Sequence, residues 1–271
     1  MATVNRESYA AAAEKLTADA RALSAAQLAT IADEILAVAR LLRGEPRLRR
    51  ALTDPSRSAV ERAGLFRSLV SGKVSVITVD TLSELVSGRF SRPADLLDAT
   101  ERLAVDTVLA AGDRDGKLAD VEDELFRFGK VVSGNGPLAV TLSDSSAPVE
   151  RRAKLVEDLL KGKVQPATAQ LIKIALEGFG GRGFDASLTR LVELTAARRD
   201  REVAYVTVAK VLDDAEEQRL AAKLAVIYGR QVSLKVDVDP SVIGGVSVRV
   251  GSDLYDGTIV RRLNEARQAL A

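Results

Sequence analysis

The chain contains an internal repeat at an offset of 90 residues, and this repeat restricts the fold to one helical unit present twice. Residues 28–54 align without a gap to residues 118–144, and eight of the 27 positions are identical. Background composition would supply roughly two or three identities. In both segments apolar residues recur every three or four positions, which is typical of amphipathic helices. Solenoid repeats have periods of roughly 20 to 50 residues, so we expect a duplicated domain instead.

The same offset relates residues 71–90 to residues 161–180. Five residues of the first segment recur in the second: Gly72, Lys73, Val74, Thr78 and Gly88 recur as Gly162, Lys163, Val164, Thr168 and Gly178. Between these blocks, residues 59–69 align with residues 148–160 if one residue is slipped, as a loop would permit.

Capping signals set the limits of the helices. Ser24 and Gln27 have the spacing of a capping box, and the glycine and proline at 44–46 and at 134–137 indicate helix ends. In the first unit we predict helices at about 6–20, then 57–70, 75–88 and 93–111. In the second unit we predict helices at about 148–160, 166–178 and 185–198. The helix at 93–111 could close the first bundle and also open the second.

The pattern changes after residue 200, where β-branched residues and alternation replace the helical spacing. Val246, Val248 and Val250 share one face of a predicted strand. The order of predicted elements is β-α-β-β-α, which indicates an α+β module. Five residues are predicted to form its structural turns: Gly244, Gly245, Gly251, Asp256 and Gly257.

The predicted fold class is therefore mainly α. Two tandem helical bundles, residues 1–111 and 112–200, are followed by a small α+β domain at 201–271. Hydrophobic residues make up 46% of the 271 positions, which is enough for real cores.

Composition also bears on function. The 39 basic and 38 acidic residues nearly balance, which disfavours nucleic acid and anionic membrane as partners. Cysteine and histidine are both absent, so thiol nucleophiles, disulfides and the usual zinc ligands are excluded. No apolar run approaches the roughly 20 residues of a membrane span, and the first ten residues lack the pattern of a signal peptide. We expect a protein of the cytoplasm, alone or on a larger assembly.

The C-terminal region resembles the delta subunit of the bacterial F-type ATP synthase, called OSCP in mitochondria. The resemblance rests on a run of matched positions: Val232, Leu234, Val238, Asp239, Val242, Gly244, Gly245, Val246, Val248, Arg249, Gly251, Asp256, Gly257, Thr258, Arg262 and Leu263. Residues 138–200 also resemble the end of the family's helical domain, and residues 7–16 resemble its first helix. The chain departs from the family in carrying two helical units, like the longer form of high-GC Gram-positive bacteria. It also has Ser252 and Thr258 where the family more often has an acidic or amide residue and a serine.

The resemblance implies a non-catalytic stator subunit without a cofactor. In this family the helical domain holds the amino-terminal helices of the alpha subunits, partly in a groove between its first and fifth helices. The C-terminal domain grips the b-subunit stalk, so that the catalytic head does not turn with the rotor and proton-driven rotation is coupled to ATP synthesis. The implied location is peripheral, at the cytoplasmic face of the plasma membrane, with one copy per complex.

Two groups of residues are the resulting candidates for partner binding. A groove for an amphipathic helix needs small residues and aliphatic anchors. The candidates for the alpha-subunit helix are Tyr9, Ala12, Ala13, Leu16, Leu82, Leu85, Val86 and Phe90. Leu263, Ala266 and Leu270 form a stripe that meets either the domain's own sheet or the b stalk.

Other signals compete with this interpretation. Residues 111–122 carry several positions of an EF-hand loop, but Ala111 stands where the first carboxylate ligand belongs. The Gly-Lys pairs at 72–73 and 162–163 lack the rest of a phosphate loop, and the glycines at 180–183 lack a preceding strand. The basic stretches at 40–50 and 196–202 have no interleaved aromatics. The alternative function is a helical adaptor that binds calcium or a small ligand, with an independent hydrolase as a third.

Overall fold

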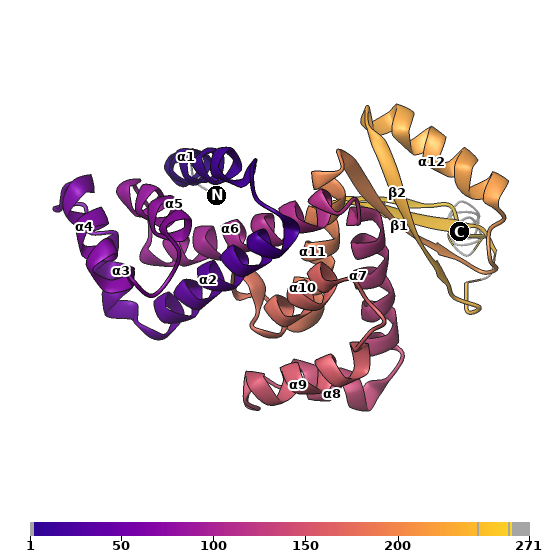
Figure 1. Cartoon of the computed structure of the whole chain (residues 1–271). Coiled ribbons are helices and arrows are strands. Elements are labelled where there is room, and N and C mark those ends of the chain that lie inside the picture. Colours follow the sequence, from indigo (N-terminus) through magenta and orange to yellow (C-terminus); the bar gives the residue numbers. More distant parts are fainter. Residues whose placement is uncertain (1–2, 243, 260, 262–271) are drawn as a thin grey trace, which may run out of the picture. The chain divides into compact units, whose positions relative to one another are not determined.

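The chain folds into two compact units, Met1–Leu191 and Val192–Ala271. A computed structural model describes residues 3–242, 244–259 and 261. The fold is mainly α, as predicted, with helices throughout the first unit and a small sheet in the second (Figure 1).

Helices make up the first unit, and the last of them continues into the second. They are α1 (Thr3–Ala20), α2 (Ala25–Gly44), α3 (Pro46–Leu52), α4 (Ala59–Val70), α5 (Val76–Ser87), α6 (Pro93–Arg114), α7 (Leu118–Ser133), α8 (Gly136–Ser143), α9 (Val149–Leu160), α10 (Pro166–Leu176), a 3-10 turn η1 (Phe179–Gly181) and α11 (Phe184–Arg198). The predicted helix limits agree to within three residues. Helix α6 runs across the boundary that was expected between residues 111 and 112.

Two short helices, α3 and α8, are not among the helices predicted from the sequence. Both follow a glycine and carry proline in their first turn, Pro46 in α3 and Pro137 in α8. These prolines were interpreted only as the ends of the preceding helices. Proline is equally suited to the first turn of a helix, because the N–H that it lacks has no partner there.

The 90-residue repeat reappears as repeated side-chain contacts, with α2–α5 as the first copy and α7–α10 as the second. The hydroxyl of Thr78 donates to Oε2 of Glu34 at 2.5 Å, and the hydroxyl of Thr168 donates to Oε2 of Glu124 at 2.5 Å. Gly72 and Gly162 both have a positive φ, of 76° and 70°. Because the same bonds recur at the same offset, the two segments are copies of one structural unit.

The one-residue slip expected between α4 and α9 is wrong. These helices begin at Ala59 and Val149, which are 90 residues apart. Arg62 and Arg152 are both buried, and both donate to main-chain carbonyls, Arg62 to Ser87 at 2.8 Å and Arg152 to Leu142 at 3.0 Å. The acceptors differ, but Phe66 and Val156 are also both buried, and the bond from the Ser56 N–H to Asp54 before α4 recurs from Ser146 to Asp144 before α9, so the copies align without a gap.

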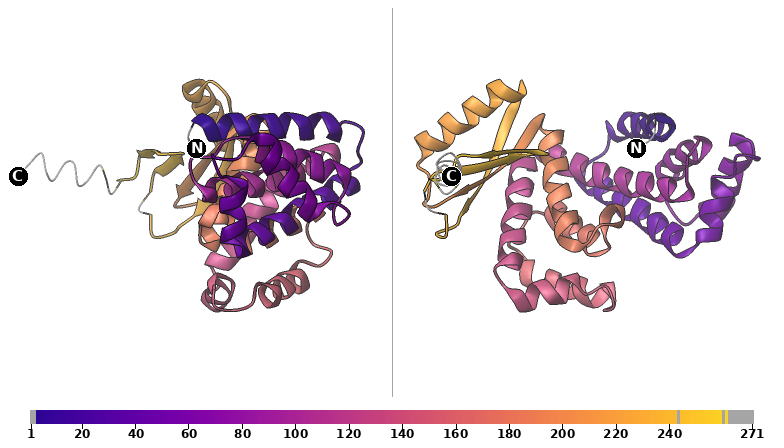
Figure 2. Two further views of the ribbon diagram at one scale, coloured as in Figure 1. Left: turned by 90° about the vertical axis from the view of Figure 1, so that its left-hand side faces the viewer. Right: turned by 180° about the vertical axis from the view of Figure 1, so that it is seen from behind.

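Helix α1 packs against α5 of the first copy (Figure 2). Its buried residues include Asn5, Ser8, Ala12, Leu16 and Ala20, which recur at helical spacing. The Ser8 hydroxyl donates to the Arg89 carbonyl at 2.9 Å, just beyond the end of α5. A Cβ at Gly88 would overlap the side chain of Ser8, so glycine is needed there for the close approach of α1.

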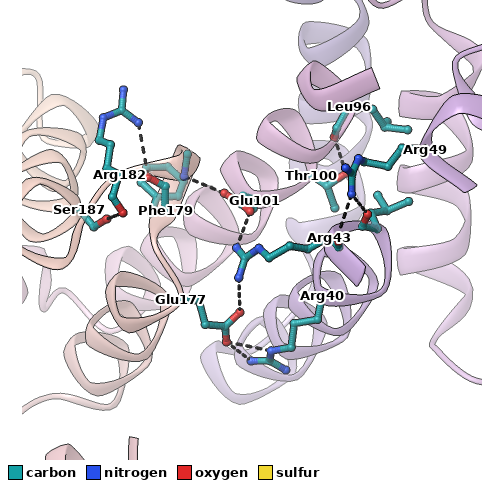
Figure 3. Close-up of polar contacts among 12 residues, drawn as sticks. Arg40, Arg43, Arg49, Leu96, Thr100, Glu101, Glu177, Phe179, Arg182 and Ser187 are labelled. Atoms are coloured by element: carbon teal, nitrogen blue, oxygen red, sulfur yellow. Dashed lines mark hydrogen bonds and ion pairs between the residues drawn. The ribbon is translucent and has the colours of Figure 1, made fainter. Parts of the chain in front are cut away.

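A network of charged side chains joins the second copy to the first (Figure 3). Arg43 of α2 pairs with Glu101 of α6 at 2.6 Å and with Glu177, next to α10, at 3.3 Å. Arg40 pairs with Glu177 at 2.7 Å, and the Gly180 N–H donates to Glu101 at 2.8 Å. Glu101 is 3% exposed, so this network lies partly inside the protein. It fixes the end of α10 and η1 against α2 and α6.

The second unit contains a four-stranded sheet with α12 on one face (Figure 1). Its elements are β1 (Arg201–Val208), α12 (Asp214–Tyr228), β2 (Gln231–Val238), β3 (Val246–Val250) and β4 (Asp253–Asp256). The strand order is β2-β1-β3-β4; β1 pairs in parallel with β2 and antiparallel with β3, and β3 pairs antiparallel with β4. Leu224 of α12 forms a core with six residues of the strands: Ala204, Val206, Val208, Val232, Val248 and Val250.

The repeated threonine contacts predict equal losses of stability in the two copies. Thr78→Val and Thr168→Val each remove a buried hydroxyl that donates to a carboxylate, so each should lower the free energy of unfolding by about 1.5–3 kcal/mol. Urea denaturation followed by the helical circular-dichroism signal measures this. The control is Thr30→Val, whose exposed hydroxyl bonds only to its own helix at the Ala26 carbonyl. A loss in one copy alone would contradict the equivalence of the copies.

The network between the copies predicts an unequal response of its two arginines. Arg43→Met leaves the buried Glu101 without its cation and should cost about 3–5 kcal/mol. Arg40→Met removes an arginine whose side chain is 52% exposed, and should cost less than about 1 kcal/mol. Both are measured by urea denaturation. Equal losses for the two variants would show that Glu101 does not depend on Arg43.

Candidate functional site

The residues predicted to form a groove between α1 and α5 are mostly buried, and these two helices pack against each other. Five of them are at most 6% exposed: Ala12, Leu16, Leu82, Leu85 and Val86. Tyr9, Ala13 and Phe90 are half-buried. The Tyr9 hydroxyl donates to Asp106 of α6, which ties α1 to a second helix. A partner helix could reach the five buried residues only if the helices packed around them moved apart.

An open hollow lies beside this contact, between α1, α4 and α5. Its volume is about 560 Å³. Helix α4 lines it with small or apolar residues, Ala59, Val60, Ala63 and Gly64. Val60 is 81% exposed, and a Cβ at Gly64 would meet no other atom within 4 Å. An exposed valine one turn from an uncovered glycine is a surface that a small-residue helix can approach closely.

Polar residues of α5 and α1 complete the hollow. Helix α5 contributes Asp80, Ser83, Glu84 and Ser87, and α1 contributes Lys15. Arg67 of α4 pairs with Asp80 at 3.3 Å and donates to Ser83 at 3.1 Å, which holds α4 against α5. Both signs of charge therefore surround an apolar wall, as expected of a surface for an amphipathic helix.

The turn before α4 fixes the direction of the helix and therefore of its apolar surface. Ser58 caps the helix in a capping box with Glu61, and the Ser58 N–H donates to Glu61 at 2.7 Å. Hydrogen bonds from the Ser58 N–H and hydroxyl lower the pKa of Glu61, and bonds from Ser56 lower that of Asp54 in the same turn. Because these folded-state pKa values are depressed, the turn gains stability above the unfolded values and loses it as pH falls through the folded ones.

Sequence reasoning missed the contribution of α4. The signal was present in the gapless alignment of the two copies, where Val60 corresponds to Glu150 and Gly64 to Lys154. The one-residue slip concealed it by matching Val60 to Val149. With the register corrected, the first copy has an apolar surface on α4 and the second copy has an i, i+4 pair of opposite charges, which is typical of a solvated helix face.

In the second unit, three of the glycines predicted to form turns have a positive φ, a conformation that favours glycine. Gly244, Gly245 and Gly251 have φ values of 66°, 85° and 55°. A Cβ at Gly245 would lie 2.5 Å from the Gly257 carbonyl oxygen, so the strand start and the turn after β4 approach closely. Asp256 accepts a hydrogen bond from the Thr258 N–H at 2.9 Å, which closes that turn.

The residues predicted to contact the b stalk, Leu263, Ala266 and Leu270, lie outside the described residues. Within the described part, Val226 and Ile227 of α12 are exposed, and so are Leu254 and Tyr255 of β4. The hydroxyl of Tyr228 bonds to the Tyr255 hydroxyl at 3.3 Å and to Asp253 at 3.0 Å. The bond to Tyr255, burial and the carboxylate of Asp253 together raise the pKa of Tyr228.

The structure does not form the calcium loop considered above. Ala111 to Arg114 belong to the last turn of α6, and α7 begins at Leu118, so only three residues lie between the helices. An EF-hand needs a loop of about 12 residues to surround the ion. No group of three or more potential His, Cys, Asp or Glu metal ligands occurs among the described residues. None of the described helices has the length and apolar character needed to cross a bilayer.

Comparisons with known proteins identify the family. A family model described as the ATP synthase delta (OSCP) subunit matches residues 105–270. An ATP synthase subunit delta of Salinispora arenicola (strain CNS-205) is 58% identical over 270 residues, which cover 100% of this chain and 98% of that protein. The corresponding protein of Streptomyces griseus subsp. griseus is 44% identical over 273 residues, and the match covers 100% of both.

Among solved structures, a chain of the Toxoplasma gondii mitochondrial ATP synthase hexamer is 16% identical, with a TM-score of 0.38 over 62% of this chain and 95% of that chain. A score this low says nothing about the arrangement of the elements. The family model and the full-length relatives suffice: the chain belongs to the ATP synthase delta (OSCP) subunit family.

Proposed function

We propose that the chain is a non-catalytic stator subunit of the proton-transporting ATP synthase. It links the amino-terminal helices of the alpha subunits to the b-subunit stalk, so that the catalytic head stays fixed while proton flow turns the rotor. It acts as one copy per complex, peripheral to the membrane at its cytoplasmic face. The observation that carries this proposal is the full-length match to delta subunits of ATP synthase.

The open hollow between α1, α4 and α5 is the proposed site for an alpha-subunit helix. This place is favoured because α1 and α5 are the first and fifth helices of the chain, and because α4 adds the exposed Val60 and the uncovered Gly64. None of the eight groove candidates named above lines this hollow, and Tyr9, Ala13 and Phe90 are the more accessible of them.

Such a site binds one helix with modest strength. Each buried aliphatic anchor contributes roughly 1.5–3 kcal/mol, and association costs several kcal/mol in lost freedom. A subunit that also holds the b stalk has several contacts on one assembly, and the later contacts form at high effective concentration. The exposed apolar residues Val226, Ile227 and Leu254 are candidates for that second contact, in addition to the stripe of Leu263, Ala266 and Leu270 predicted from the sequence.

Gly64→Lys tests the proposed site. A Cβ at this lining position meets no other atom within 4 Å, and the lysine replaces a helical glycine, so the free protein should be as stable or about 0.5–1 kcal/mol more stable. We expect at least a tenfold weaker affinity for the delta-depleted ATP synthase on membranes, and correspondingly less restored ATP synthesis at a limiting protein concentration.

The matched control is Gly129→Lys in α7, where a Cβ also meets no atom within 4 Å. It should restore synthesis as the native chain does. An unchanged affinity of the Gly64→Lys chain would contradict the proposed site. A native chain that does not bind depleted membranes, or that hydrolyses ATP by itself, would contradict the stator function.

A further inference from the structure

Arg62 of the first copy and Arg152 of the second occupy the same position in the repeat, and both are buried. Arg62 reaches from α4 to the end of α5. Its Nε donates to the Val86 carbonyl at 3.2 Å, and its Nη2 donates to the carbonyls of Ser87 and Gly88 at 2.8 and 2.9 Å. The last carbonyls of a helix have no partner within that helix, so Arg62 caps α5 from a neighbouring helix.

Arg152 lacks this set of acceptors. Its Nη1 donates to the Leu142 carbonyl at 3.0 Å, but its Nε is buried and has no hydrogen-bond partner among the described residues. The carbonyls that correspond to those capped by Arg62 belong to residues 176–178, at the end of α10. A buried donor without an acceptor is unfavourable, so the second copy keeps the capping arginine of the repeat without the helix end that it would cap.

The chain takes a different path after α10 than after α5. Gly88 follows α5 with an extended backbone, φ −67° and ψ 177°, whereas Gly178 is left-handed, with φ 80° and ψ 66°. From Gly178 the chain turns into η1, and the Gly178 carbonyl accepts a hydrogen bond from the Gly181 N–H at 3.0 Å. Glycine adopts both conformations readily, so the path can change at Gly178 at little cost.

Charged side chains of α2 hold the end of α10 on its present path (Figure 3). Glu177 pairs with Arg40 at 2.7 Å and with Arg43 at 3.3 Å. Ser87 stands in place of Glu177 in the first copy, and its hydroxyl donates to a carbonyl of its own helix at 2.9 Å. The path that leaves Arg152 without its acceptors is therefore the path on which α2 and the end of α10 are joined.

The polar contact of α9 with α10 is weaker than that of α4 with α5. Arg67 of α4 donates to Ser83 at 3.1 Å and pairs with Asp80 at 3.3 Å. At the place that corresponds to Arg67 and Ser83, Glu157 of α9 pairs with Lys173 of α10 at 3.8 Å, and both side chains are exposed. Exposed ion pairs contribute little to stability, so this contact does not prevent α9 from moving on α10.

We propose that the second copy is a two-state joint, in which α9 is poised to close on the end of α10. In the closed state Gly178 is extended, Arg152 caps the carbonyls of residues 176–178 as its counterpart does in the first copy, and Glu177 leaves the arginines of α2. The two sets of contacts exclude each other, because residues 176–178 cannot follow both paths. Closing α9 therefore loosens the joint between the copies. This inference concerns the free chain and does not depend on the proposed stator function.

Glu177→Ser tests the inference, because serine is the residue at this place in the first copy and cannot pair with the arginines of α2. Hydrogen exchange of the full-length chain, followed by mass spectrometry of peptides from α9, measures how firmly that helix is docked. We expect the variant to slow exchange in α9 by at least about tenfold, as the closed state becomes the major one. If Glu177 served only to hold the copies together, its loss would speed this exchange or leave it unchanged.

Arg152→Met shows which group is responsible. In the native chain it should change the exchange of α9 by less than about twofold, because Arg152 does not cap α10 there. Added to Glu177→Ser, it should return the exchange of α9 to the native rate. The matched control is Arg62→Met, which removes a cap that is already formed and should speed exchange at the end of α5 by at least about tenfold in either background.

Gly178→Ala approaches the closed state by a second route. Alanine is strained at a φ of 80°, and its Cβ would lie 2.9 Å from the Arg182 carbonyl oxygen, but it is compatible with the extended backbone of the closed state. It should also slow the exchange of α9. The matched control for backbone strain is Gly116→Ala, which has a φ of 68° and open space around its Cβ, and it should leave α9 unchanged.

Two outcomes would overturn the inference. One is unchanged or faster exchange of α9 in both the Glu177→Ser and the Gly178→Ala chains. The other is a slowing of exchange that persists when Arg152→Met is added. Neither outcome bears on whether the native chain binds the depleted ATP synthase, which tests the proposed function separately.

Discussion

The pairing of Arg43 with Glu101 and Glu177 determines where the second helical copy lies on the first. Glu101 is buried, and a buried carboxylate needs a cation and hydrogen-bond donors close to it. Arg43 supplies the cation from α2, and the Gly180 N–H supplies a donor from η1. Because Arg43 also holds Glu177, the same guanidinium draws the end of α10 onto α2.

The residues that hold the two copies together are among those that the repeat does not preserve. Arg43 and Glu101 correspond to Ser133 and Leu191, and Glu177 corresponds to Ser87. An interface between two tandem copies exists only once, so only one copy of each position can take part in it. Contacts within a copy, such as Thr78 with Glu34, are repeated because each copy must satisfy its own buried groups. Differences between the copies therefore point to interfaces, and identities point to internal packing.

Much of the fold could be predicted from residue patterns, and much less of the candidate site. The helix limits, the capping box at Ser24 and the β-α-β order follow from local spacing and capping, which act within a few residues. The groove residues followed from the family resemblance and from small and apolar residues at helical spacing, and the same spacing serves a helix that is buried by another part of the chain. Leu82 and Val86 are buried inside the protein, and the open hollow is lined instead by polar residues of α5 and by α4.

The sequence by itself determined that one helical unit occurs twice, that an α+β module follows, and that the chain resembles the delta subunits. These conclusions depend on the periodicity of apolar residues, on turn-forming residues and on short motifs, all of which are local in the sequence. Only the tertiary structure decided the gapless register of α4 and α9, the burial of the predicted groove and the ion pairs that join α2 to the end of α10. The physical reason is that a side chain's exposure depends on which distant helix packs against it, and helices 100 residues or more apart in sequence, such as α2 and α10, meet only in the folded protein.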